Sequence, residues 1–93
     1  MKYQAFIKTL LCPYTCTGEG FHRTITPLSA EGKEIKTSAP IISNTGESIP
    51  DFITRVVKDI AKFNEAQVSQ LLEHGLSDPT IEFQLLSNVE PIK

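Results

Sequence analysis

The chain has 93 residues, of which 40% are hydrophobic and 22% charged, and its formal net charge is −2. This size and composition predict one globular domain over residues 1–93 and exclude a disordered chain. One core uses most of the apolar residues and leaves few to enclose a substrate pocket, so we expect neither an enzyme nor a cofactor. No apolar stretch is long enough to cross a membrane, so we expect no membrane partner.

The nine basic residues are scattered along the chain and form no basic stripe. This distribution disfavours binding of nucleic acid through its phosphates. Near the N-terminus, Gln4 and Lys8 interrupt the apolar residues too early for a signal peptide. We therefore expect a cytoplasmic protein with reduced cysteines.

Residues 2–12 predict the first strand, followed by a loop over 13–20 that begins at Pro13. Phe6 and Leu10 fall on the polar face of this strand, which predicts that they meet a partner. The expected core face alternates with polar positions and consists of Tyr3, Ala5, Ile7 and Leu11.

Two further strands are predicted over residues 21–29 and 34–42, because both segments are rich in β-branched and aromatic residues. Residues 30–33 predict a hairpin turn between them, with Gly32 at positive φ. Pro27 and Pro40 lack an N–H donor, which predicts that these strands lie at sheet edges.

Ser48 is an expected N-cap for a helix that runs to about Phe63 with an apolar face at helical spacing. Asn64 predicts the cap of a second helix, which ends at Gly75 in a left-handed residue. A last strand follows over residues 80–87, and residues 88–93 are expected to fray. The order β-β-β-α-α-β predicts an α+β fold in which two consecutive helices cover one face of a mostly antiparallel, four-stranded sheet.

The segment from Cys12 to Cys16, Cys-Pro-Tyr-Thr-Cys, resembles the CPYC redox motif of glutaredoxins. The cysteines are three residues apart instead of two, and the glycine-rich residues after them are a poor helix start, so we do not assign the chain to that family. The cysteines have three interpretations: packing residues, which we favour, a redox pair, or zinc ligands together with His22. A zinc site would need His74 as the fourth ligand, and the spacing matches no zinc finger, so we expect no metal.

The strongest functional hypothesis is a small protein-binding module, which regulates or inhibits its partner by occupying a surface. The size suits antitoxins, immunity proteins and phage-borne inhibitors of host defence. A second copy of the chain could also pair at a sheet edge. The alternatives are a nucleic-acid-binding accessory protein and a small metal or redox protein. The expected partner-binding residues are Phe6, Leu10, Tyr14, Phe21 and Arg23.

Overall fold

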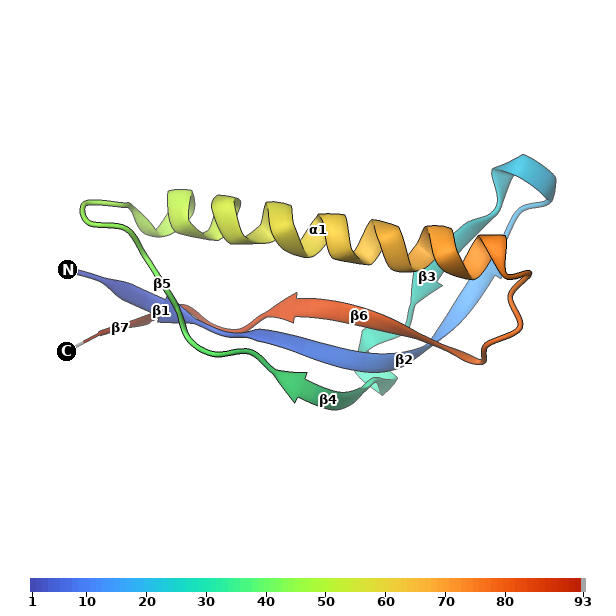
Figure 1. Ribbon diagram of the computed structural model, residues 1–93, viewed down its shortest axis with the longest axis horizontal. Coiled ribbons are helices and arrows are strands. Elements are labelled where there is room, and N and C mark those ends of the chain that lie inside the picture. Colours follow the sequence, from blue (N-terminus) through green and yellow to red (C-terminus); the bar gives the residue numbers. More distant parts are fainter. Residues whose placement is uncertain (93) are drawn as a thin grey trace.

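A computed structural model describes residues 1–92 and shows an α+β fold with antiparallel sheets and a single α-helix in that range (Figure 1). The molecule is elongated, with extents of 48 × 24 × 17 Å. In chain order the elements are β1 (Tyr3–Ala5), β2 (Ile7–Thr17), β3 (Thr24–Pro27), β4 (Lys33–Thr37), β5 (Ile41–Ile42), α1 (Ile49–Glu73), β6 (Thr80–Leu86) and β7 (Glu90–Pro91).

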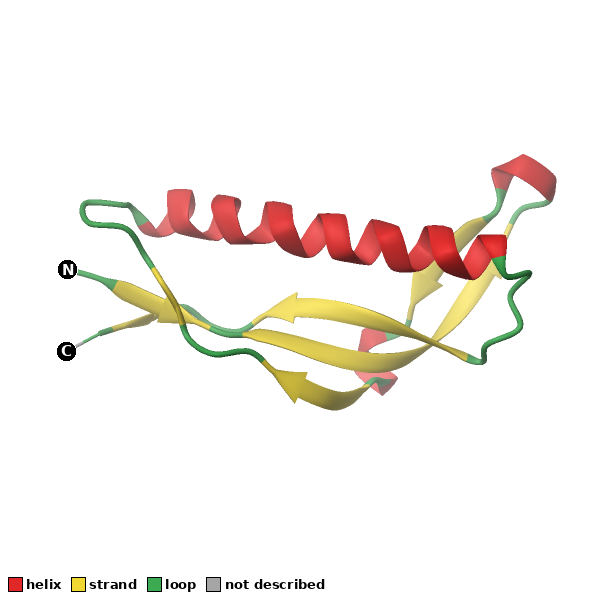
Figure 2. Ribbon diagram, viewed as in Figure 1, coloured by secondary structure: helices red, strands yellow, loops and turns green. Residues whose placement is uncertain are grey.

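The strands form two sheets, and the prediction of one four-stranded sheet is wrong. One sheet has the order β5-β1-β7; in the other, β2 pairs with β3, β4 and β6. Strands β1 and β2 follow one another in the chain; β1 is the central strand of the first sheet and β2 is the central strand of the second (Figure 2). All pairings are antiparallel. The tail expected to fray contains β7, which pairs with β1, and Lys93 lies outside the described residues.

Three serine side chains pair with the backbone between residues 3 and 7, two of them at the break between β1 and β2 and one at the start of β1. At each such position a serine N–H donates to a carbonyl of the central strand, and the serine Oγ accepts the N–H of the same residue. The three pairs are Ser43 with Tyr3, Ser87 with Phe6, and Ser38 with Ile7. The hydroxyls therefore replace strand carbonyls, so these N–H groups keep an acceptor.

The helix begins as predicted, because the Ser48 Oγ accepts the N–H of Asp51 at 3.2 Å and Pro50 lies in the first turn. It does not end at Phe63, so the prediction of two consecutive helices is wrong. Asn64 lies within α1 and faces β6. Its side chain accepts the Gln84 N–H at 2.8 Å and donates to the Gln84 carbonyl at 3.2 Å. A polar residue therefore occupies the inward stripe of α1 because it binds the backbone of β6.

The helix follows the outer edge of β6, next to that strand along its length (Figure 1). Along β2, Ile7 packs against the buried cluster formed by the first half of α1, whereas Leu10 and Cys12 pack against Leu71 from the second half. Because side chains alternate along a strand, Ile7 and Leu10 point to opposite faces. We infer that α1 crosses the β6 edge near Asn64 and covers a different face with each half.

This crossing explains why the predicted core face of the first strand is only partly correct. Ala5 and Ile7 contribute to the core as expected. Beyond the crossing the buried positions are Leu10 and Cys12, and Leu11 is exposed. Leu10, which we predicted to meet a partner, is a core residue.

The connection between β3 and β4 also differs from the prediction. Residues Ser29–Glu31 form a 3₁₀ turn, and Gly32 has a negative φ of −73°. A Cβ at Gly32 would lie 2.6 Å from the Sγ of Cys12, so glycine is required here by close packing and not by positive φ. The strand predicted over 80–87 is confirmed as β6, and the left-handed Gly75 is confirmed with a φ of 76°.

Within residues 1–92, no helix combines the length and apolar character needed to traverse a lipid bilayer.

Candidate functional site

The tip of the β2–β3 hairpin is the most exposed apolar feature of the structure. The two strands pair as far as Thr17 and Thr24, and Gly20–His22 form a 3₁₀ turn between them. Gly18 has a φ of 84°, and a Cβ there would collide with the carbonyl oxygen of His22. The turn therefore depends on glycine and holds Phe21 out into solvent.

Phe21 has a relative exposure of 106%, more than any other large apolar side chain in the described residues. Arg23 follows on the same tip and is also exposed. A hollow of about 410 Å³ lies between the tip and the end of α1, and Phe21 and Arg23 line it together with Leu72 and Glu73. In Figure 1 the tip projects at the end of the molecule opposite both termini. We define Phe21 and Arg23 as the tip surface.

The other predicted partner-binding residues have structural contacts. Tyr14 lies on β2, not in a loop, and its hydroxyl donates to the Asp78 carbonyl at 2.6 Å. This bond fixes the segment after α1 to the sheet. Phe6 is half-buried at the break between β1 and β2, and Leu10 is buried. The structure thus brings Phe21 and Arg23 together but does not gather all five residues on one surface.

The two cysteines are free, with Cys12 buried and Cys16 exposed. Both lie on β2, and four residues of extended strand place their Cα atoms roughly 13 Å apart. A disulfide needs a Cα separation below about 7 Å, so this strand cannot contain a Cys12–Cys16 bond. Burial raises the pKa of the Cys12 thiol, which disfavours the reactive thiolate.

His22 lies in the turn beyond β2 and is exposed. Across residues 1–92, no group of three or more His, Cys, Asp or Glu side chains is placed to hold a metal ion. The metal and redox interpretations therefore gain no support from the positions of Cys12, Cys16 and His22.

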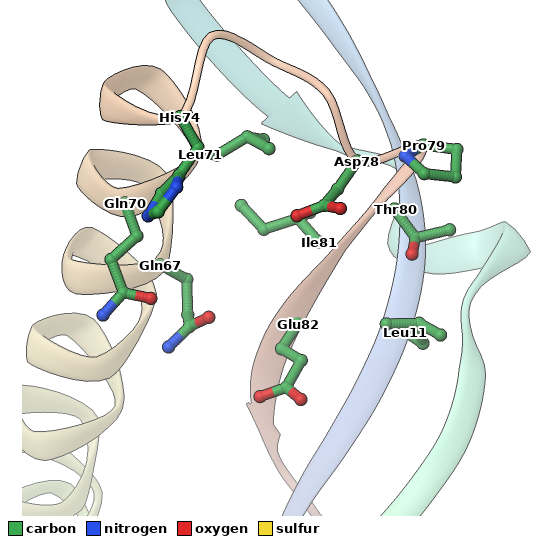
Figure 3. Close-up of a pocket in the computed structure, with 10 residues that line it drawn as sticks. All are labelled: Leu11, Gln67, Gln70, Leu71, His74, Asp78, Pro79, Thr80, Ile81 and Glu82. Atoms are coloured by element: carbon green, nitrogen blue, oxygen red, sulfur yellow. The ribbon is translucent and has the colours of Figure 1, made fainter.

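A polar cleft of about 360 Å³ lies between the end of α1 and the start of β6 (Figure 3). Gln67, Gln70 and His74 enter it from the helix, and Asp78 and Glu82 from the opposite side. The lining contains no lysine or arginine. Chemically, the cleft can accept hydrogen bonds from a cationic or amide group. We did not predict it from the sequence, because its walls combine segments that are distant along the chain.

A second groove, of about 520 Å³, lies between β3 and α1. Its apolar lining is Ile25, Pro27, Val68 and Phe83, and Asn64, Glu65 and Ser69 complete the wall from α1. Unlike the polar cleft, this groove can take an apolar side chain. We call it the β3–α1 groove.

The outer edge of β4 is exposed at all five residues. It carries Lys33 and Lys36, and the pairing with β2 shifts by one residue at Ile35. Charged residues and such a bulge are means by which natural sheets prevent edge pairing. The β4 edge is therefore a poor surface for pairing with a second copy.

Comparison with known proteins adds no relative, since no family model, no curated protein and no solved structure matches the chain.

Proposed function

We propose that the chain is a small protein-binding module that regulates or inhibits its partner by occupying a surface, with Phe21 as the anchor. The full exposure of Phe21 is the observation that supports this proposal. Removing a phenylalanine side chain from water is worth about 2–3 kcal/mol, which the folded chain does not gain by itself. A partner with an apolar pocket would gain it.

The build of the tip also supports an anchor role. The paired ends of β2 and β3 support the turn, and its glycines permit the positive φ that the turn needs, so the ring is presented by a hairpin. A side chain presented in this way loses less conformational entropy on binding. Arg23 is two residues away, and aromatic residues and arginine are the types most enriched at binding hot spots.

The experiment is a pull-down from the native host with mass spectrometry, followed by affinity measurement with the purified partner. Phe21→Ala should raise the dissociation constant at least about tenfold, since each 1.4 kcal/mol corresponds to a factor of ten. Val57→Ala is the matched control, because Val57 is exposed on α1 and is not part of the tip. Equal affinities for wild type and Phe21→Ala would refute the anchor role.

The absence of catalysis stays a prediction. It would be contradicted by a reaction that depends on side chains of the polar cleft.

A further inference from the structure

We infer that the tip surface binds the β3–α1 groove of a second copy of the chain, which gives a two-fold symmetric dimer. The inference rests on the proposed function, because it assigns a partner to the same tip. Each copy has a fully exposed apolar side chain, Phe21, and an open apolar groove of about 520 Å³. The volume lies within the range of small-molecule binding pockets.

The charges next to these two features are complementary. Arg23 follows Phe21 on the tip, and Glu65 lies in the wall of the groove. Within the described residues the one ion pair is Arg55–Glu47, so neither Arg23 nor Glu65 has an opposite charge in contact within its own chain. Insertion of Phe21 into the groove would bring Arg23 of one copy towards Glu65 of the other. Complementary charges of this kind set the register and the choice of partner.

The positions of tip and groove along β3 fit two-fold symmetry. The tip immediately precedes β3, and Ile25 and Pro27 of β3 line the groove. A two-fold axis near the start of β3, between the tip and the groove residues Ile25 and Pro27, would exchange the tip of one copy with the groove of the other. In such an isologous interface every contact occurs twice.

The edge of β3 permits this approach. It is the last strand on its side of β2, and its residues Thr24–Pro27 include no charged side chain. The β4 edge, by contrast, carries two lysines and a bulge. Of these two edges, β3 is the one without charged side chains and without a bulge, and its length of four residues and its terminal Pro27 limit the pairing to a short contact.

The experiment is sedimentation equilibrium of the full chain and its variants, with circular dichroism to confirm that each variant is folded. We expect a wild-type dimer with a dissociation constant in the micromolar range. Phe21→Ala should weaken it at least about 100-fold, since two equivalent contacts are lost per dimer. Arg23→Glu and Glu65→Arg should each weaken it at least about tenfold, and the double variant should restore it to within about threefold.

Two controls make the test specific. Glu73 also lies near the tip, but Arg23→Glu combined with Glu73→Arg should not restore the dimer. Val57→Ala should leave it unchanged. A wild-type chain that stays monomeric at about 1 mM, a dimer unaffected by Phe21→Ala, or rescue by Glu73→Arg would each overturn the inference.

The outcomes also separate this inference from the proposed function. If the chain is monomeric but Phe21→Ala abolishes binding of a host protein, the dimer is wrong and the proposed function stands. If Phe21→Ala abolishes the dimer while a host protein still binds with unchanged affinity, the dimer stands and the anchor role towards that partner fails.

Discussion

Asn64 allows the sharpest test of the fold, because the helix and the sheet meet at its side chain. Asn64→Ala removes both hydrogen bonds to the backbone of Gln84, at 2.8 and 3.2 Å. Leaving partly buried backbone groups without these partners costs about 1–3 kcal/mol. Alanine regains roughly half a kcal/mol through its higher helix propensity. The net loss is about 0.5–2.5 kcal/mol, which in a domain of this size lowers Tm by about 2–20 °C.

The assay is urea and thermal unfolding followed by far-UV circular dichroism. Asn64→Asp distinguishes two roles of Asn64, namely a bridge of two hydrogen bonds to the backbone of Gln84 and the helix cap that we predicted from the sequence. Aspartate caps a helix as well as asparagine does, but it cannot donate to the Gln84 carbonyl. The bridge therefore predicts that Asn64→Asp is less stable than wild type, whereas a cap predicts no change. Lys62→Ala, two residues away on the exposed face of α1, should stay within about 0.5 kcal/mol of wild type.

If Asn64→Asp is as stable as wild type, the single helix anchored to β6 is the wrong description. Hydrogen exchange gives a second measurement, because the Gln84 amide proton should exchange faster in Asn64→Ala than in Lys62→Ala.

Three further predictions concern stability and reactivity. Ser87→Ala removes the acceptor of the Phe6 N–H at 2.8 Å, so urea unfolding should show a loss of about 1–3 kcal/mol. An aromatic disulfide reagent should modify Cys16 in the native protein but Cys12 only after unfolding, because burial shields that thiol and raises its pKa. Hydrogen bonds from the Arg55 guanidinium lower the pKa of the Glu47 carboxyl. The Glu47 carboxylate therefore stabilises the folded protein above its unfolded pKa of about 4.3, and this stabilisation is lost as the pH falls through the lower folded pKa. Glu47→Gln should accordingly lose less stability than wild type over that acidic range.

Each of these predictions can fail clearly. An unchanged stability of Ser87→Ala would show that the serine hydroxyl does not support the pairing. Rapid native modification of two thiols per chain would contradict the burial of Cys12. If the free energy of unfolding falls equally with decreasing pH in wild type and Glu47→Gln, the Arg55–Glu47 ion pair does not contribute to the stability of the folded state.

Local chemistry made some elements predictable. Ser48 and Gly75 are correct as the ends of the helical region, because capping depends on residues close in sequence. The strand over 80–87 is correct for the same reason, since its alternation lies within one segment. By contrast, Asn64 is a good cap in isolation and becomes a helix-interior residue only because the edge of β6 offers it two backbone partners.

The core face of the first strand could not be predicted in full, because the covering element changes sides. Alternation identifies two faces of a strand but not which face a distant helix covers at each point. Here Ile7 and Leu10 are both used for packing although they point to opposite faces. The packing role of Gly32 could not be predicted either, since its close neighbour is the Cys12 sulfur, twenty residues earlier in the chain.

The residues of the candidate site likewise differ in how far local sequence predicts their environment. The exposure of Phe21 could be predicted from the sequence, because a large aromatic residue after a glycine-rich segment has no apolar neighbours next to it in the chain. Tyr14 has the same residue chemistry, yet it is committed to the Asp78 carbonyl, which lies 64 residues later. The β3–α1 groove had no signal in any single segment, since three separate elements form it.

The exposed tip and the open groove share one property, because each leaves apolar surface in contact with water. The Phe21 ring is fully exposed, and it lines an open hollow of about 410 Å³ together with Leu72 of its own chain. The β3–α1 groove is likewise open, although Asn64 holds the helix to β6 beside it. The Phe21 ring and the groove are therefore both open to water in the folded chain. This is the physical reason to expect binding of a protein surface, and the wild-type association state is the first measurement that tests it.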